Sequence, residues 1–198
     1  MKICPVYWGL IHDNINSSQQ SINDLSKLLT DFKKHKYSKH DSFFNLCIFS
    51  DIIIIDLTIL LEKVRLANRE QEKKLYARVI ALTIVDYLDN ISVLIGRDCL
   101  TELKNNNMTE FLDEFKSIYK KFSIFKKDNE RVLRDIRNNT IAHKSRDALK
   151  LNTYINNLNV EDIYNYGLEL KIFSKEFIDL STKIIYYIVD YMKEGRKI

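Results

Sequence analysis

The chain has 198 residues, 45% of them hydrophobic, which suits one large domain or a core domain with an extension rather than two full domains. Its 31 basic and 27 acidic residues give a formal net charge of +4, so charge allows a nucleic-acid partner without indicating one. The three cysteines lie far apart and are odd in number, which excludes a readable disulfide framework or zinc site and favours a reducing, cytoplasmic setting.

The first part of the chain is predicted to form a helical hairpin over residues 17–67. One proline and four glycines in the whole sequence leave long stretches without helix breakers. After an irregular start, we expect an amphipathic helix over Ser17–Lys36, a polar break over Tyr37–Asp41 and a long apolar helix over Ser42–Ala67. His35 and His40 fall in the polar sequence around the break and are expected to be exposed.

The longest apolar stretch, Leu46–Leu61, is predicted to be a core helix. Asp51 and Asp56 interrupt it, so its continuous runs fall short of the roughly 20 apolar residues that span a bilayer. The first ten residues contain Pro5 and Gly9 and lack a continuous apolar region, so no secretory signal is expected either. No membrane partner is predicted.

A core bundle is predicted over residues 70–193. Its first helix, Glu70–Ile95, is expected to end at Gly96, which suits the left-handed position after a helix. Apolar residues then recur at steps of three and four, and Asp128 is expected to cap a further helix. Asn159 is expected to cap the last helix, whose apolar face holds Phe173, Phe177, Leu180, Ile184, Ile188 and Tyr191. The sequence therefore predicts a single all-α domain, an antiparallel helical bundle with the hairpin packed on it.

Polar and titratable groups concentrate between the apolar stripes, over Arg134–Lys144. Its paired asparagines and β-branched residues are mediocre helix formers, so the helix is expected to weaken, bend or end near His143. An arginine can hold a phosphate, and a histidine can exchange a proton near neutral pH. Together they suffice for RNA cleavage without a metal or cofactor, because a base can take the 2′-hydroxyl proton while a cation stabilises the transition state.

The string Arg137, Asn138 and, after four further residues, His143 resembles the motif of the HEPN superfamily. That motif is an arginine, a polar residue that is often asparagine, and a histidine four to six residues after the arginine. The resemblance is close in the motif and loose over residues 70–193. It implies a HEPN-like core and a metal-independent endoribonuclease, of the sort found as bacterial toxins, abortive-infection effectors and anti-phage defence effectors. It also implies that Arg137 binds the scissile phosphate, Asn138 supports the site and His143 acts in proton transfer.

The resemblance further implies a homodimer and a partner protein, such as an antitoxin or another defence component. Six residues at about 100° each place Arg137 and His143 roughly 120° apart on an ideal helix. Either the helix distorts at residues 138–140, or the site pairs Arg137 of one subunit with His143 of another across the motif helix. One toxin branch of the superfamily has a tyrosine two residues after the histidine that its antitoxin modifies. Ser145 stands there, so that regulation is not expected.

Other polar residues around the motif have two interpretations each. Four basic residues that flank it form either an RNA backbone groove or a solvated helix face: Arg131, Arg134, Lys144 and Arg146. Arg78, Asp86 and Asp89 interrupt an apolar helix and form either a buried ion pair or hydrogen-bonding support for the site, with a structural role favoured. The alternatives to a nuclease are a non-catalytic helical module that binds RNA, a nucleotide or a protein, and a plain helix end.

Overall fold

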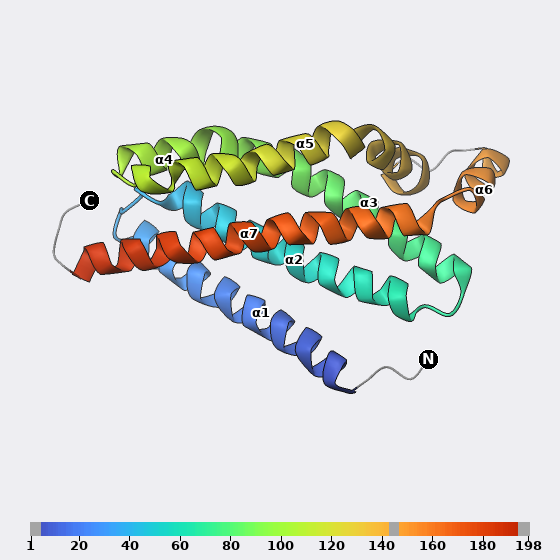
Figure 1. Cartoon of the computed structure of the whole chain (residues 1–198), viewed down its shortest axis with the longest axis horizontal. Helices are drawn as coiled ribbons and strands as arrows, with labels where there is room; N and C mark the ends of the chain where they lie inside the picture. The colour runs from blue at the N-terminus through green and yellow to red at the C-terminus, as the bar shows by residue number, and fades with distance from the viewer. Residues whose placement is uncertain (1–4, 143–146, 194–198) are drawn as a thin grey trace. The chain divides into compact units, whose positions relative to one another are not determined.

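A computed structural model describes residues 5–142 and 147–193, and every secondary-structure element in these ranges is helical (Figure 1). The all-α prediction is therefore confirmed. The elements in chain order are α1 (Pro5–Lys34), α2 (Asp41–Leu66), α3 (Glu70–Val93), the π-helical segment η1 (Leu94–Cys99), α4 (Leu100–Asn105), the 3₁₀ turn η2 (Thr109–Phe111), α5 (Leu112–Arg137), the π-helical segment η3 (Asn138–Ala142), α6 (Ala148–Asn156) and α7 (Val160–Lys193).

The chain divides into two compact units, each made of separate segments. The first unit holds residues 1–55, 91–119 and 174–198, and the second holds residues 56–90 and 120–173. Helices α2, α3, α5 and α7 each contribute to both units, because their bounds cross the division. Neither unit coincides with the hairpin or the core bundle expected from the sequence, so the domain boundaries given above stay a prediction.

In the first unit, aromatic rings and a left-handed residue close the turn between α1 and α2. Lys36 has a φ of 57°, and the amide of Tyr37 donates to the carbonyl of Phe32 at 2.8 Å, which is a helix C-cap. The Phe32 ring meets Tyr37 and Phe44 edge-on, with centroids 4.9 and 5.6 Å apart. His40 is fully buried beside these rings, so its predicted exposure is wrong: ring packing outweighs the polar sequence around it. Burial lowers the pKa of His40 to about 4.

The predicted helix end at Gly96 is also wrong. The chain passes through Gly96 as the π-helical segment η1 and continues into α4. Ile95 and Cys99 are fully buried on either side of it, and burial of this kind overrides the weak helix propensity of one glycine. The turn falls after α4 instead, at Asn107, whose φ is 59°. From α4, the carboxylate of Glu102 accepts the first amides of α2 at 2.8 and 2.9 Å and so caps that helix.

The apolar helix α2 is long and apolar enough to cross a membrane by length and composition alone. In its most apolar window of 18 residues, 56% is buried inside the described protein, as in a core helix. Asp51, on this helix, is buried and accepts a hydrogen bond from the hydroxyl of Ser21 on α1 at 2.8 Å. That bond satisfies a carboxylate whose pKa burial raises. The β-branched residues Ile52–Ile55 also belong to helix α2.

In the second unit, the middle segments of α3, α5 and α7 pack through aromatic rings. The ring of Phe122 lies edge-on between Tyr87 and Phe173, with centroids 5.7 and 6.0 Å away. Helix α7 approaches α2 closely at Gly167, where a Cβ atom would lie 2.9 Å from Cδ2 of Leu61. A side chain at this position would therefore have to displace core residues, which explains a glycine inside a long helix.

Several helix boundaries differ from the sequence-based expectation, and one is confirmed. Helix α1 already includes Pro5, where the described residues start, and so extends well before the expected start at Ser17. Asp128 caps nothing, because α5 runs through it without a break. Asn159 caps α7 as predicted: its Oδ1 accepts the amides of the second and third residues at 3.1 and 3.4 Å. On the predicted apolar face of α7, the buried side chains are Phe177, Leu180, Ile184 and Ile188. The side chains of Phe173 and Tyr191 on the same face are half-buried.

Candidate functional site

The candidate site begins where α5 stops being an α-helix. Helix α5 ends at Arg137, and residues 138–142 continue as the π-helical segment η3. Two side chains explain the change: Asn139 Nδ2 donates to the carbonyl of Asp135 at 2.9 Å, and Thr140 Oγ1 donates to the carbonyl of Ile136 at 2.6 Å. Such bonds compete with the backbone amides for the same carbonyls and loosen or bend a helix. The predicted weakening of the helix is confirmed, and the distortion given as one of two alternatives is present.

Arg137 lies at this junction with a contact on each side. Its side chain is 22% exposed, and Nη1 lies 3.6 Å from Oδ1 of Asp86 on α3. Its Nε donates to Oδ1 of Asn138 at 3.1 Å. Of the two alternatives given for Arg78, Asp86 and Asp89, a buried ion pair does not describe Asp86, whose side chain is 56% exposed. Arg78 instead donates to the carbonyl of Lys74 on its own helix at 3.2 Å, and burial lowers its pKa.

A network of charged groups joins α3 and α5 one turn earlier. Arg134 contacts Asp89 through Nη2 and donates to Glu130 through Nε at 2.7 Å. Lys126 Nζ lies 3.4 Å from Asp89 and 4.0 Å from Glu130. The hydrogen bond to Glu130, and then the contact with Asp89, raise the pKa of Arg134. Together with the Arg137–Asp86 pair, three cations and three carboxylates balance, so this cluster has no net formal charge.

The structure describes some of the remaining predicted site residues and not others. Arg131 is exposed on α5, whereas Arg134 is half-buried in the network just described. His143, Lys144 and Arg146 lie outside the described residues. The structure thus brings together Arg137, Asn138 and Asp86 and leaves the other half of the motif undescribed. Across residues 5–142 and 147–193, no cluster of three or more histidine, cysteine or acidic side chains could hold a metal ion.

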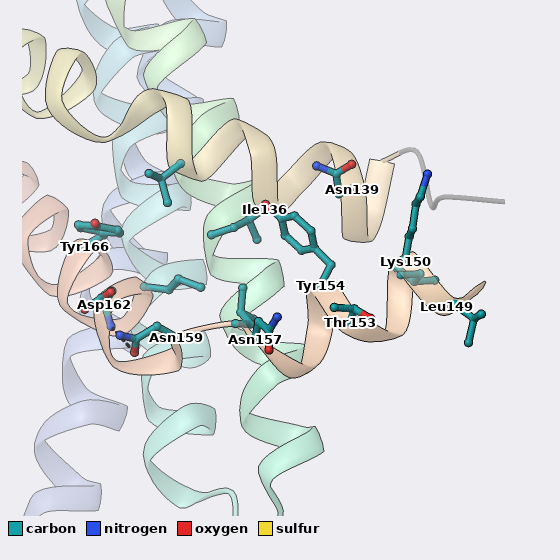
Figure 2. Close-up of a pocket in the computed structure, with 14 residues that line it drawn as sticks. Ile136, Asn139, Leu149, Lys150, Thr153, Tyr154, Asn157, Asn159, Asp162 and Tyr166 are labelled. Carbon is teal, nitrogen blue, oxygen red and sulfur yellow. Dashed lines mark hydrogen bonds between the residues drawn. The ribbon is translucent and has the colours of Figure 1, made fainter. Parts of the chain in front are cut away.

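A pocket of about 670 Å³ beside the motif was not predicted from the sequence. Its walls come from the end of α5, from η3, from α6 and from the start of α7 (Figure 2). Ile136 and Asn139 line it from the motif segment. Helix α6 forms the opposite wall and is held to α5 because the hydroxyl of Tyr154 donates to the carboxylate of Asp135. Burial, and then this hydrogen bond, raise the pKa of Tyr154 to about 12.

The position of α6 has two local sequence signals. The side chain of Asp147 accepts the amides of Leu149 and Lys150 at 3.0 and 3.1 Å, which is an N-cap. Apolar residues also recur at helical spacing, namely Leu151, Tyr154, Ile155 and Leu158, although none of the helix's own residues is fully buried. No helix was predicted from either signal.

The chain matches no protein-family model, no curated protein and no solved structure. The resemblance to HEPN proteins therefore stays an expectation from the motif residues Arg137, Asn138 and His143.

Proposed function

We propose that the chain is a metal-independent endoribonuclease. The observation that carries the proposal is the string of Arg137, Asn138 and His143 at the point where α5 changes to a π-helical segment. Breaks of this kind in a helix frequently coincide with functional sites. The long contact between Arg137 and Asp86 supports a role in phosphate binding, because the carboxylate that orients the 22% exposed Arg137 side chain lies 3.6 Å away and is itself 56% exposed, so a phosphate can replace it.

The proposed reaction needs only groups that this chain supplies. The His143 imidazole removes the proton from a ribose 2′-hydroxyl, and the 2′-oxygen forms a bond to the adjacent phosphorus. Arg137 holds the non-bridging oxygens and stabilises the extra negative charge as the bond to the 5′-oxygen breaks. The leaving 5′-oxygen takes up a proton from water, and the protonated His143 imidazole returns its proton to the solvent, so protons balance over the cycle. The products are a 2′,3′-cyclic phosphate and a free 5′-hydroxyl. Asn138 steadies Arg137 through the hydrogen bond to its Nε.

The proposal also covers the oligomeric state, the cellular location and a partner of the protein. A homodimer through the motif helix brings two copies of Arg137 and His143 to one cleft. A cytoplasmic location gives access to RNA, and a partner protein such as an antitoxin or another defence component restrains the activity. Toxicity on expression and co-purification of the partner test these points.

The direct experiment incubates the purified chain with RNA in the presence of a chelator and analyses the product ends. We expect 2′,3′-cyclic phosphates, and a loss of about 10²-fold or more in rate for His143→Ala and for Arg137→Ala. His35→Ala and Arg69→Ala serve as matched controls, since His35 and Arg69 are exposed and lie outside the motif. Circular dichroism and thermal unfolding establish that each variant is folded.

Intact RNA with folded wild-type protein, over a range of pH and salt, would overturn the nuclease. Binding of RNA that survives His143→Ala but falls with Arg137→Ala, with no cleavage by the wild type, assigns the chain to non-catalytic binding modules instead. The reason is that a phosphate contact does not need the group that transfers a proton.

A further inference from the structure

The pocket beside the motif has the size and lining of a site for a small flat group. Its volume of about 670 Å³ falls within the range typical of small-molecule sites, roughly 300–1,000 Å³. Buried Ile163 and half-buried Leu158 make part of its lining apolar, and the rings of Tyr154 and Tyr166 contribute from α6 and α7 (Figure 2). Aromatic and apolar walls are what an unstacked nucleic-acid base requires in place of its neighbours.

One side of the pocket carries a paired acceptor and donor. Asp162 and Asn159 lie next to each other at the start of α7 (Figure 2). The Asn159 Oδ1 is used to cap the helix, so its amide nitrogen is the group that it can offer to a ligand. The carboxylate of Asp162 accepts hydrogen bonds only. An acceptor beside a donor matches a base edge on which an N–H group stands beside a carbonyl oxygen, as in guanine and uracil. Guanine has two adjacent N–H groups, at N1 and N2, which can meet both oxygens of a carboxylate, whereas uracil has one.

The pocket adjoins Arg137 through the backbone itself. Ile136 lines the pocket and directly precedes Arg137, and Asn139 lines it two residues later. Consecutive Cα atoms are 3.8 Å apart, so the pocket wall and Arg137 belong to the same turn of the chain, but at about 100° per residue the Arg137 side chain leaves that turn toward Asp86 on α3 and does not line the pocket. The hydrogen bonds from Asn139 and from the Tyr154 hydroxyl to Asp135 fix that wall. A nucleotide whose phosphate meets Arg137 must therefore pass around this turn for its base to enter the pocket.

We infer that this pocket binds one unpaired RNA base, with guanine preferred, next to the phosphate that is cleaved. The inference rests on the proposed function, because it places the substrate relative to Arg137. Tyr154 and Tyr166 contact the faces of the base, and Asp162 and Asn159 bind its edge. The pocket thus makes cleavage dependent on the base beside the scissile bond.

The first test fills the pocket without touching the motif. Thr153 is exposed on α6 and lines the pocket, and its neighbour Asn152 is exposed on the same helix but does not line it. Thr153→Trp therefore places an indole in the pocket, and Asn152→Trp is the matched control. We expect Thr153→Trp to lower the affinity of the His143→Ala protein for a short single-stranded RNA by about tenfold, measured by fluorescence anisotropy, and Asn152→Trp to leave it unchanged.

The second test replaces one of the two acceptor oxygens of Asp162 with a donor. Asp162→Asn and Glu161→Gln each remove one negative charge from the exposed first turn of α7, but only Asp162 lines the pocket. We expect mapped cleavage sites of the wild type to favour guanine at one fixed position, and Asp162→Asn to reduce that preference by about tenfold. Glu161→Gln should retain it.

The outcomes separate the two proposals. Cleavage with no base preference, and equal affinity for RNA in both tryptophan variants, overturns the base pocket and leaves the nuclease standing. Absence of cleavage with guanine-dependent binding that Thr153→Trp abolishes overturns the nuclease and supports the pocket. If Thr153→Trp changes the oligomeric state in size-exclusion chromatography with light scattering while RNA affinity stays the same, a protein surface occupies the pocket and the inference is wrong.

Discussion

The hydroxyl of Tyr154 provides the sharpest test of how α6 is held to the end of α5. Tyr154→Phe removes only the oxygen that donates to Asp135 and keeps the ring in place. The rise of the Tyr154 pKa from 10.0 to about 12 sets an upper limit of about 2.7 kcal/mol on the interaction. Asp135 is exposed, and solvent screening reduces the expected loss in unfolding free energy to about 1 kcal/mol. In a domain of this size that loss lowers Tm by about 2–4 °C.

The same interaction predicts a dependence on pH with a definite sign. The pKa of Tyr154 is higher in the folded than in the unfolded protein, so the folded state favours the protonated hydroxyl. The stabilisation is therefore complete below pH 10 and is lost as the pH rises through about 12. The difference in stability between wild type and Tyr154→Phe should be constant from pH 7 to 9 and should shrink above pH 10.

Urea unfolding at several pH values measures this difference. The chain has 11 tyrosines, so a difference absorbance titration between wild type and variant isolates the ionisation of Tyr154 from the others. Tyr186→Phe is the control, because the Tyr186 side chain is 67% exposed and its loss should change little. Equal stability of wild type and Tyr154→Phe at pH 7, or ionisation of Tyr154 near pH 10, would refute the assignment of this hydrogen bond.

Three further substitutions test the packing and the caps. Asp147→Ala removes the N-cap of α6 and should cost about 1 kcal/mol, seen as faster amide hydrogen exchange in that helix alone. Gly167→Leu should lower the unfolding free energy in urea by about 1–3 kcal/mol, because its side chain collides with Leu61 and Ile80; an unchanged midpoint would contradict the close approach. Glu102→Ala should lower Tm, through a loss of about 1–2 kcal/mol, since two amides at the start of α2 lose their acceptor.

Local signals in the sequence predicted those parts of the fold that local interactions determine. Asn159 caps α7 as expected, because the cap depends only on residues two and three positions later. The predictions of a helix end at Gly96 and of a helix cap at Asp128 were wrong for the opposite reason. At both positions, burial of neighbouring residues in the tertiary structure determines that the helix continues. Phe125 and Leu133, both buried, hold α5 helical on either side of Asp128. A residue with low helix propensity ends a helix only where the neighbouring core does not hold the helix together.

The candidate site was predictable only where it is continuous in sequence. Arg137 and Asn138 could be singled out from the motif string, and the mediocre helix formers after them indicated a distorted turn. The position of Asp86 beside Arg137 depends on how α3 meets α5, and the pocket depends on four elements that the chain brings together. Periodicity in the sequence does not indicate which side chains of different helices lie together. The pocket could therefore be identified only from the structure.

The two arginines in the last turn of α5 differ in how readily they can exchange a partner. Arg134 is half-buried and contacts two carboxylates, so a phosphate would have to replace contacts that tie α5 to α3. Arg137 is the less exposed of the two, at 22% against 33%, but it lies 3.6 Å from a single carboxylate that is 56% exposed, and ion pairs that reach solvent in this way contribute about 0–1 kcal/mol. Charge-assisted contacts with a phosphate are stronger than that. Of the two, the physical argument therefore favours Arg137 as the phosphate ligand, on grounds independent of any family resemblance.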